Sequence, residues 1–213
     1  MSDADRWFAT VDDYTLCRGG GNGPICVTQI MPILKFVKDG DSFLDVGCGS
    51  GTTLDALKAL KKEVKYKGTD FIEHRIEWLK KTYPDNEFSV GDARKLDEPD
   101  RSWDIVWSRH VVDHLGSFEE AIDEHCRVAK KYVICVLWMS FAEGDEHLIK
   151  PIVENGKVFP DEWTNQYSRD LVNDYLEKKC DQGWQLEDFL EKITWNGSTE
   201  GQGRDTVIVL RRL

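Results

Sequence analysis

The sequence lacks any apolar run that approaches the ~20 residues with which a helix crosses a bilayer. It also lacks the pattern of an export leader at its start, where Met-Ser-Asp-Ala-Asp-Arg is polar and acidic instead of basic and then apolar. These two absences predict that the protein has no membrane partner and a cytoplasmic location.

Paired cysteines are also missing. The six cysteines are scattered, with no Cys-x-x-Cys pair, at Cys17, Cys26, Cys48, Cys126, Cys135 and Cys180. Zinc sites and disulfide-stapled folds use cysteines at close, repeated spacings. We therefore expect buried free thiols in a reducing compartment, with neither a metal nor a disulfide.

Acidic residues outnumber basic ones in the sequence. The chain has 28 lysines and arginines against 39 acidic residues, which gives a net charge of −11. Proteins that grip a nucleic-acid backbone neutralise phosphates with a basic face. The densest basic stretch, from Lys58 to Lys67, is interpreted as the solvated surface of a helix. The composition therefore disfavours a nucleic-acid partner.

Glycine, by contrast, is concentrated where a short apolar strand ends. Residues 43 to 51 read Phe-Leu-Asp-Val-Gly-Cys-Gly-Ser-Gly, and leucines then recur at helical spacing at Leu54, Leu57 and Leu60. Alternating glycines permit a sharp turn with positive φ and leave no Cβ to obstruct a ligand. The unit is therefore a strand, a glycine loop and a helix whose N-terminus points at whatever lies over the loop.

The glycine spacing separates several kinds of nucleotide-binding loop. A dinucleotide fingerprint, Gly-x-Gly-x-x-Gly, needs its third glycine where Thr52 stands, and a P-loop needs Gly-Lys-Ser/Thr, which does not follow. The remaining pattern, Asp-x-Gly-x-Gly-x-Gly, resembles motif I of the class I S-adenosylmethionine-dependent methyltransferases. A bare connecting turn is the alternative, but it rarely needs three alternating glycines after an acid.

The resemblance extends over most of the chain and implies a fold. Further strands are expected at 64–69, 88–90, 103–108, 132–139, 184–193 and 206–210. We predict an α/β, Rossmann-like, doubly wound, seven-stranded sheet, mostly parallel, with one antiparallel strand near the C-terminus. Residues 1–213 would form a single methyltransferase domain, since this length supports one core.

The same resemblance implies where S-adenosyl-L-methionine would bind. Asp70, at the end of the second strand, would accept both ribose hydroxyls, and Asp92 would accept from the adenine amino group. In the N-terminal segment, Arg18 could pair with the methionine carboxylate and Tyr14 could cover the sulfonium. The full set of expected cofactor residues is Asp45, Gly47, Cys48, Gly49, Asp70, Phe71, Asp92, Ala93, Arg109, Arg18 and Tyr14.

Residues 1–40 comprise a glycine-rich loop and a first helix, expected at about 25–37. The run Gly-Gly-Gly-Asn-Gly at 19–23 does not hold a fixed shape cheaply. It is either a flexible connector or a loop that orders over ligand, and the sequence leaves both interpretations open.

The segment after the fourth strand, Arg-His-Val-Val-Asp-His-Leu, resembles the family's motif IV region, which faces the acceptor. His110 is the first choice for proton removal and Asp113 the second. His110 and His114 have the spacing of two metal ligands on a helix, but a third ligand is missing. The Asp/Asn-Pro-Pro-Tyr/Phe motif of methyltransferases that act on nucleic-acid amines is also absent here.

Residues 140–167 form an insertion, which we expect to act as a substrate lid with His147, Trp163 and Tyr167 contacting the acceptor. The alternative is a hairpin that turns at residues 154–157 and packs on the sheet edge. Both interpretations can hold together.

Two serines are expected to cap helices. Ser117, with Glu120 three residues later, has the spacing of a capping box ahead of a helix with Phe118 and Ala129 on its apolar face. Ser168 is the N-cap candidate of a later helix, whose buried side would be lined by Leu171, Val172, Tyr175 and Leu176.

These observations favour transfer of a methyl group from S-adenosyl-L-methionine to an oxygen or nitrogen of a small molecule. Within enzymes, the alternative acceptor is a protein or an RNA. A third hypothesis is a cofactor-binding sensor, or the inactive partner of an active subunit. The polar residues His110, Asp113 and His147 argue against the third.

Overall fold

Seven strands form one sheet in the computed structural model, which describes residues 27–138, 141–142, 151–154, 157–163, 165–194 and 204–213. The strands are β1 Ser42–Val46, β2 Lys65–Asp70, β3 Glu87–Val90, β4 Trp103–Arg109, β5 Ala129–Trp138, β8 Trp184–Thr194 and β9 Arg204–Arg212. Their order is β3-β2-β1-β4-β5-β9-β8. β9 runs antiparallel to both of its neighbours, whereas β1 to β5 pair in parallel. The predicted fold class is confirmed.

The strand order reverses between β1 and β4. The chain proceeds outward from β1 through β2 to β3, and then returns to place β4 on the other side of β1. Ligands of open α/β sheets bind at the carboxyl ends of the strands at such a reversal. Gly47 follows β1 and His110 follows β4, so both predicted site segments meet at this edge.

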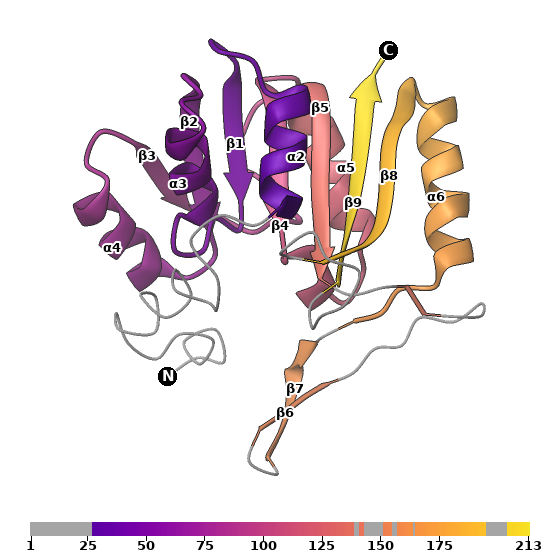
Figure 1. Cartoon of the computed structure of the whole chain (residues 1–213). Helices are drawn as coiled ribbons and strands as arrows, with labels where there is room; N and C mark the ends of the chain where they lie inside the picture. The colour runs from indigo at the N-terminus through magenta and orange to yellow at the C-terminus, as the bar shows by residue number, and fades with distance from the viewer. Residues whose placement is uncertain (1–26, 139–140, 143–150, 155–156, 164, 195–203) are drawn as a thin grey trace.

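Helices cover both faces of the sheet (Figure 1). Their bounds are α2 Val27–Phe36, α3 Thr52–Ala59, α4 Glu73–Thr82, α5 Glu119–Val128 and α6 Arg169–Asp181. Buried side chains of α2, α3 and α4 share one apolar cluster with one face of the sheet. Those of α5 and α6 share a second cluster with the other face. The sheet is therefore the middle of three layers.

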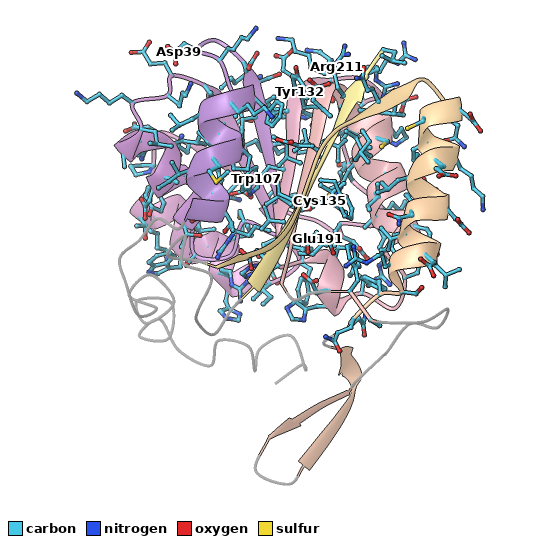
Figure 2. All side chains as sticks on the ribbon, turned by 45° about the vertical axis from the view of Figure 1, so that its right-hand side comes forward. Asp39, Trp107, Tyr132, Cys135, Glu191 and Arg211 are labelled. Carbon is cyan, nitrogen blue, oxygen red and sulfur yellow. The ribbon has the colours of Figure 1, made fainter. Side chains whose placement is uncertain are left out.

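The central strands are apolar on both faces, as expected of strands between two helical layers. Trp107 on β4 and Ile134 on β5 have no exposed surface. Figure 2 shows Trp107 and Cys135 inside the molecule, whereas Asp39 and Arg211 lie at its outer rim, at the edge where the parallel strands begin. The opposite edge, where those strands end, carries the candidate site.

The predicted capping box at Ser117 is wrong. The helix α5 begins at Glu119, its N-cap is Phe118 with no side-chain cap, and the Ser117 hydroxyl donates to the Glu119 carboxylate instead. A neighbouring charged acceptor has taken the hydroxyl away from the backbone. Ala129, expected on the helix, is the first residue of β5.

The predicted N-cap at Ser168 is confirmed, because its Oγ accepts a hydrogen bond from the Leu171 amide at 3.3 Å. On α6, Val172 and Leu176 are buried as expected. Leu171 is 40% exposed, so it does not line the buried side. The first described helix, α2, falls within the bounds expected for it.

The insertion contains a hairpin of β6 Pro151–Glu154 and β7 Lys157–Trp163. Glu154 pairs with Lys157, which confirms the predicted turn; residues 155–156 lie outside the described part. Figure 1 shows the hairpin projecting beyond the carboxyl ends of β1 and β5, so it does not pack along the sheet edge. At its base Ala142 bridges Ser168, and the Ala142 amide donates to the Tyr167 carbonyl at 2.9 Å.

The described residues contain neither a membrane-spanning helix nor a metal-binding cluster. No helix among them is long and apolar enough to span a membrane. Nor do they include a group of three histidine, cysteine or acidic side chains placed to hold a metal ion.

Candidate active site

The glycine loop turns as its spacing predicts. Gly47, Gly49 and Gly51 have φ of +69°, +55° and +81°, in the left-handed region that favours glycine. The Gly47 and Cys48 amides both donate to the Thr69 carbonyl of β2, at 2.7 and 3.0 Å. The loop is therefore tied to the neighbouring strand as well as to its own.

The glycines differ in what surrounds them. A Cβ on Gly47 would lie 2.2 Å from a methyl carbon of Val111, which follows β4. A Cβ on Gly49 would meet nothing closer than the Gly47 carbonyl oxygen at 4.0 Å. The missing side chain of Gly47 thus leaves room for Val111, whereas Gly49 faces open space on the side where a ligand can approach.

Asp70 holds the glycine loop from the end of β2. Its carboxylate accepts from the Gly49 amide at 3.0 Å, the Ile72 amide at 3.1 Å and Nη1 of Arg75 at 3.0 Å. The side chain is 3% exposed. A carboxylate offers about four lone-pair sites. Asp70 can therefore keep these bonds and still accept from a hydroxyl group above the loop.

An apolar platform lies beside Asp70. Phe71 is 58% exposed and Val90 is 52% exposed, although both are large apolar residues. They are close in space because Asp70 pairs with Val90 in the register of β2 and β3. Exposed apolar groups beside a polar anchor suit a flat ring with hydrogen-bonding edges.

Asp92 and Ala93 follow β3 next to this platform. The Asp92 side chain is 45% exposed and forms an ion pair with Arg94, whose Nη2 lies 2.7 Å from Oδ2. The hydrogen bond from Arg94 holds the pKa of Asp92 below its usual value. Asp92 is thus a charged acceptor within reach of a ligand, and its contact with adenine stays a prediction.

Asp45 and Cys48 lie beneath the loop. Asp45 is 1% exposed and accepts from the Tyr66 hydroxyl at 2.8 Å; burial raises the pKa of its carboxyl to about 7, against the Tyr66 hydrogen bond. Burial also raises the pKa of Cys48, whose Sγ would lie 2.9 Å from a Cβ on Gly68. In this position both side chains support the loop from inside, and only the Cys48 backbone belongs to its surface.

The end of β4 brings two polar residues to the same edge. Within the described residues, the Nε of Arg109 is buried without a hydrogen-bond partner. His110 has φ of +54°, which is uncommon for a residue with a side chain and typical of functional sites. Its Nε2 lies 3.0 Å from Oδ1 of Asp205, at the start of β9.

Burial and three neighbouring residues set the pKa of His110. Burial lowers the pKa of its imidazole, and the hydrogen bond with Asp205 opposes this by raising it. The positive charge of Arg109 lowers the pKa further, as does His114 when charged. Because the net direction is downward from 6.5, His110 is neutral at pH 7 and can accept a proton.

Asp113 and Tyr167 lie deeper than expected. Asp113 is 2% exposed, in the short turn Val112–His114. Tyr167 is also 2% exposed, with its hydroxyl 2.7 and 2.9 Å from the carbonyl oxygens of Val112 and Leu115. The Tyr167 side chain therefore braces the turn after β4, and its contact with the acceptor stays a prediction.

Several predicted residues cannot be placed. Tyr14, Arg18 and His147 lie outside the described residues, and Trp163 is described only as the last residue of the β7 backbone. Conversely, sequence reasoning missed Asp205, Thr28 and Val111. The antiparallel orientation expected of the last strand would have brought its first residues to this edge and could have identified Asp205.

The comparisons with known proteins agree with this geometry. A family model described as a methyltransferase domain matches residues 44–137. An uncharacterised methyltransferase of Schizosaccharomyces pombe is 34% identical over 116 residues, which are 48% of this chain and 42% of that protein. Ajmaline N-methyltransferase of Rauvolfia serpentina is 34% identical over 95 residues (41% and 32%). Ribosomal protein L11 methyltransferase of Dictyoglomus turgidum is 37% identical over 117 residues (50% and 38%).

The chain thus matches less than half of the length of these relatives. Solved structures share the fold over more of the chain. An S-adenosylmethionine-dependent methyltransferase of Methanosarcina mazei has a TM-score of 0.67 at 18% identity, covering 86% of this chain and 97% of that one. A putative Haloferax volcanii methyltransferase, in complex with the activator Trm112, has a TM-score of 0.68 at 17% identity and covers 98% of both chains.

Proposed function

The chain carries a methyltransferase domain of the class I S-adenosylmethionine-dependent family, and on that premise we propose that it methylates an oxygen or nitrogen of a small molecule. The observation that carries the proposal is His110, a neutral histidine at the carboxyl end of β4 beside the glycine loop. A group that can take a proton stands where the family places its acceptor.

The residues present fit the family's cofactor, S-adenosyl-L-methionine. Gly49 leaves a space that a Cβ would enter, and Asp70 lies directly behind it. The buried, unpartnered Nε of Arg109, within the described residues, is a donor suited to a carboxylate.

We assign each part of the cofactor to residues of this edge. Asp70 would accept from the ribose hydroxyls, and Phe71 with Val90 would contact the adenine ring. Asp92 would accept from the adenine amino group, and Arg109 would hold the methionine carboxylate. Tyr14 and Arg18 remain proposed contacts from the N-terminal segment.

When bound, the cofactor supplies a methyl group on a positively charged sulfur. The protein then contributes chiefly position, since aligning two reactants can supply roughly 7 to 11 kcal/mol of the barrier. A general base contributes about 10² to 10⁴ in rate. His110 would therefore increase the rate of a reaction whose geometry is set mainly by the glycine loop and by the turn Val112–His114.

The class of acceptor is inferred from charge and from His110. A net charge of −11 works against a phosphate backbone, which favours a small molecule over RNA. The relatives include a methyltransferase named for the small molecule ajmaline and one named for a ribosomal protein. A protein or RNA acceptor is the second candidate, favoured by the neighbour that was solved with an activator protein. The hydrogen-bonded His110 argues against an inactive sensor.

Calorimetry tests the cofactor assignment. Asp70→Asn removes a charge that supports the loop and faces the ribose, and hydrogen bonds to charged groups contribute about 1.5 to 3 kcal/mol each. We expect adenosylhomocysteine to bind at least about tenfold more weakly to this variant. Asp104→Asn, at the opposite edge of the sheet, is the matched control and should bind normally.

Equal affinity of Asp70→Asn and the unchanged protein would remove Asp70 from the site. A thermal-shift screen adds a second comparison, because a bound ligand raises stability by about 2.7 kcal/mol at a hundredfold excess over its Kd. Stabilisation by NAD or NADP, and not by adenosylmethionine, would overturn the cofactor assignment.

A labelled methyl group tests the acceptor class. Purified protein is incubated with methyl-labelled cofactor and, in separate reactions, pooled small metabolites, bulk tRNA or cell protein. Label that appears only with metabolites, and is lost in His110→Ala, supports the proposal. Label that appears only in tRNA or protein would replace it with the second candidate.

A further inference from the structure

Three buried side-chain oxygens have no hydrogen-bond partner, and they are the full set of such oxygens in the described residues. They are Oδ1 of Asn165, Oε1 of Glu191 and Oγ1 of Thr206. Buried polar groups are nearly always hydrogen-bonded, because an unpaired one costs free energy. A group of this kind therefore marks a place where a binding partner is missing.

Glu191 and Thr206 are neighbours near the end of β8 and the start of β9. The register of β8 with β9 shifts just after Leu190, at Glu191, which therefore lies opposite Thr206. On β9, Thr206 alternates with Ile208, which belongs to the apolar cluster on the face covered by α5 and α6. Glu191 reaches the same face, because its Oε2 forms an ion pair with Nη1 of Arg169 at the start of α6.

The segment 165–169 joins this pair to the turn after β4. At its first residue, Nδ2 of Asn165 donates to the Leu115 carbonyl, which only accepts, so Oδ1 is the atom left unpaired. At its last residue, Arg169 holds Glu191. Figure 2 shows Glu191 on the side of the molecule from which the hairpin projects. The three oxygens thus lie where the insertion returns to the sheet.

An aromatic pair borders Glu191. The rings of Phe141 and Phe189 stack with their centroids 5.7 Å apart and 8° between their planes. Phe189 precedes Glu191 by two residues on β8. The guanidinium carbon of Arg169 lies 5.8 Å from the Phe141 ring centroid, so this arginine contacts both the carboxylate and the aromatic pair. Small-molecule sites combine apolar walls with a few polar groups in this way.

We propose that Glu191 and Thr206 bind a hydrogen-bond donor of the methyl acceptor, an amine or a hydroxyl group, beside this aromatic pair. A carboxylate only accepts hydrogen bonds, whereas a threonine hydroxyl can accept or donate. An amine or hydroxyl satisfies both oxygens, while a carboxylate or phosphate of the acceptor would set further acceptors against Glu191. This inference rests on the proposed function and deepens it by naming a group that the small molecule must carry.

Exposure determines how this donor enters. The Glu191 side chain is 21% exposed, so a ligand can contact its carboxylate from outside. Thr206 has no exposed surface, so the bound group has to extend past Glu191 to reach it. The order of the two residues favours a donor at the end of a small substituent.

Urea titration of Thr206→Val tests the inference without an acceptor. Valine has the same shape but no hydroxyl, so removal of an unpaired Oγ1 should lower the equilibrium constant of unfolding by about fivefold or more. Thr53→Val is the matched control, because Thr53 is also buried but its hydroxyl bonds to Asp45, and this variant should be less stable. A less stable Thr206→Val would mean that its hydroxyl bonds within the protein, which would overturn the inference.

Initial rates with methyl-labelled cofactor and a dilution series of pooled small metabolites test the binding itself. Glu191→Gln and Thr206→Val should each raise the pool concentration at half-maximal rate by about tenfold, with a maximal rate within about threefold of normal. Glu187→Gln is the control, another glutamate of β8 that pairs with an arginine, and should change neither. An unchanged half-maximal concentration in either test variant would contradict the inference.

Adenosylhomocysteine affinity, measured by calorimetry, separates this inference from the proposed function. Glu191→Gln and Thr206→Val should bind it as the unchanged protein does, because neither residue belongs to the glycine loop. Label that appears only in tRNA or protein would contradict the proposed function, and this inference with it. Labelled metabolites with an unchanged half-maximal concentration would contradict this inference alone.

Discussion

Gly49 and Gly40 have the same type of backbone conformation in different surroundings. Both have positive φ, +55° and +87°, and neither has a neighbour that would clash with a Cβ. Alanine at either position should cost about 1 to 2 kcal/mol of stability, because a left-handed residue with a Cβ is strained. Only Gly49 faces the proposed cofactor.

We therefore expect Gly49→Ala to weaken adenosylhomocysteine binding by about tenfold or more, while Gly40→Ala changes it by less than about twofold. Calorimetry at one temperature, with chemical denaturation of both variants, separates affinity from stability. Equal losses of affinity in the two variants would mean that strain alone, and not the open face of Gly49, governs binding.

His125 makes the stability of the protein depend on pH. It is 0% exposed on α5, and burial lowers the pKa of its imidazole to about 4 from the usual 6.5. Between pH 6.5 and about 4, His125 therefore binds a proton in the unfolded chain but not in the folded protein. Stability from this residue is complete above pH 6.5 and decreases as pH falls, by on the order of 3 kcal/mol at pH 4.

His125→Leu keeps an apolar body in the core and removes the titration. We expect its free energy of unfolding, from urea titrations, to fall less steeply between pH 6.5 and 4 than that of the unchanged protein. His74→Gln, on the exposed side of α4, is the control and should retain the steep dependence. The same slope in His125→Leu and in the unchanged protein would assign the acid sensitivity to other groups.

The segment that follows the hairpin of the insertion is attached to the turn Val112–His114, which comes after β4. The Asn165 amide donates to the Asp113 carbonyl at 2.9 Å, and the Tyr167 hydroxyl contacts the carbonyls of Val112 and Leu115. The segment that follows β7 is therefore held beside the proposed acceptor position. We propose that the hairpin forms one wall or a lid of the acceptor site.

Trp163, at the end of β7 nearest to that anchor, should contact the acceptor. Once an acceptor is known, we expect Trp163→Ala to raise its KM by about tenfold, with a kcat within about threefold of normal. Shortening the turn at residues 154–157 should have a milder effect, because the turn is the far end of the hairpin. An unchanged KM in Trp163→Ala would reduce the insertion to a structural role.

Local patterns predicted the elements well where one physical signal dominated. The apolar run from Tyr132 identified β5 because a strand buried on both faces has few polar positions. The Asn155-Gly156 pair identified a hairpin turn. The capping-box pattern gave a wrong prediction at Ser117 because Glu119 competes for its hydroxyl. The spacing of a capping box takes no account of such a competing acceptor.

At the scale of the whole molecule, the site depends on contacts that no local pattern contains. Asp70 was predictable, because its distance from the glycine loop is set by one strand–helix–strand unit. Asp205 is 95 residues from His110 and 177 from Thr28, so only the position of β9 between β5 and β8 brings the three together. The burial of Tyr167 likewise results from tertiary packing on Phe118, the N-cap of α5, and on the turn after β4.

Because Ala142 and Ser168 are bridged, the chain leaves the central fold and returns to it at one place. A loop whose ends already meet can change in length at little entropic cost. The family model stops at residue 137, just before this segment. We therefore expect that the hairpin can be exchanged for another segment without disturbing the strands of the sheet, and we propose that such an exchange would change the choice of acceptor.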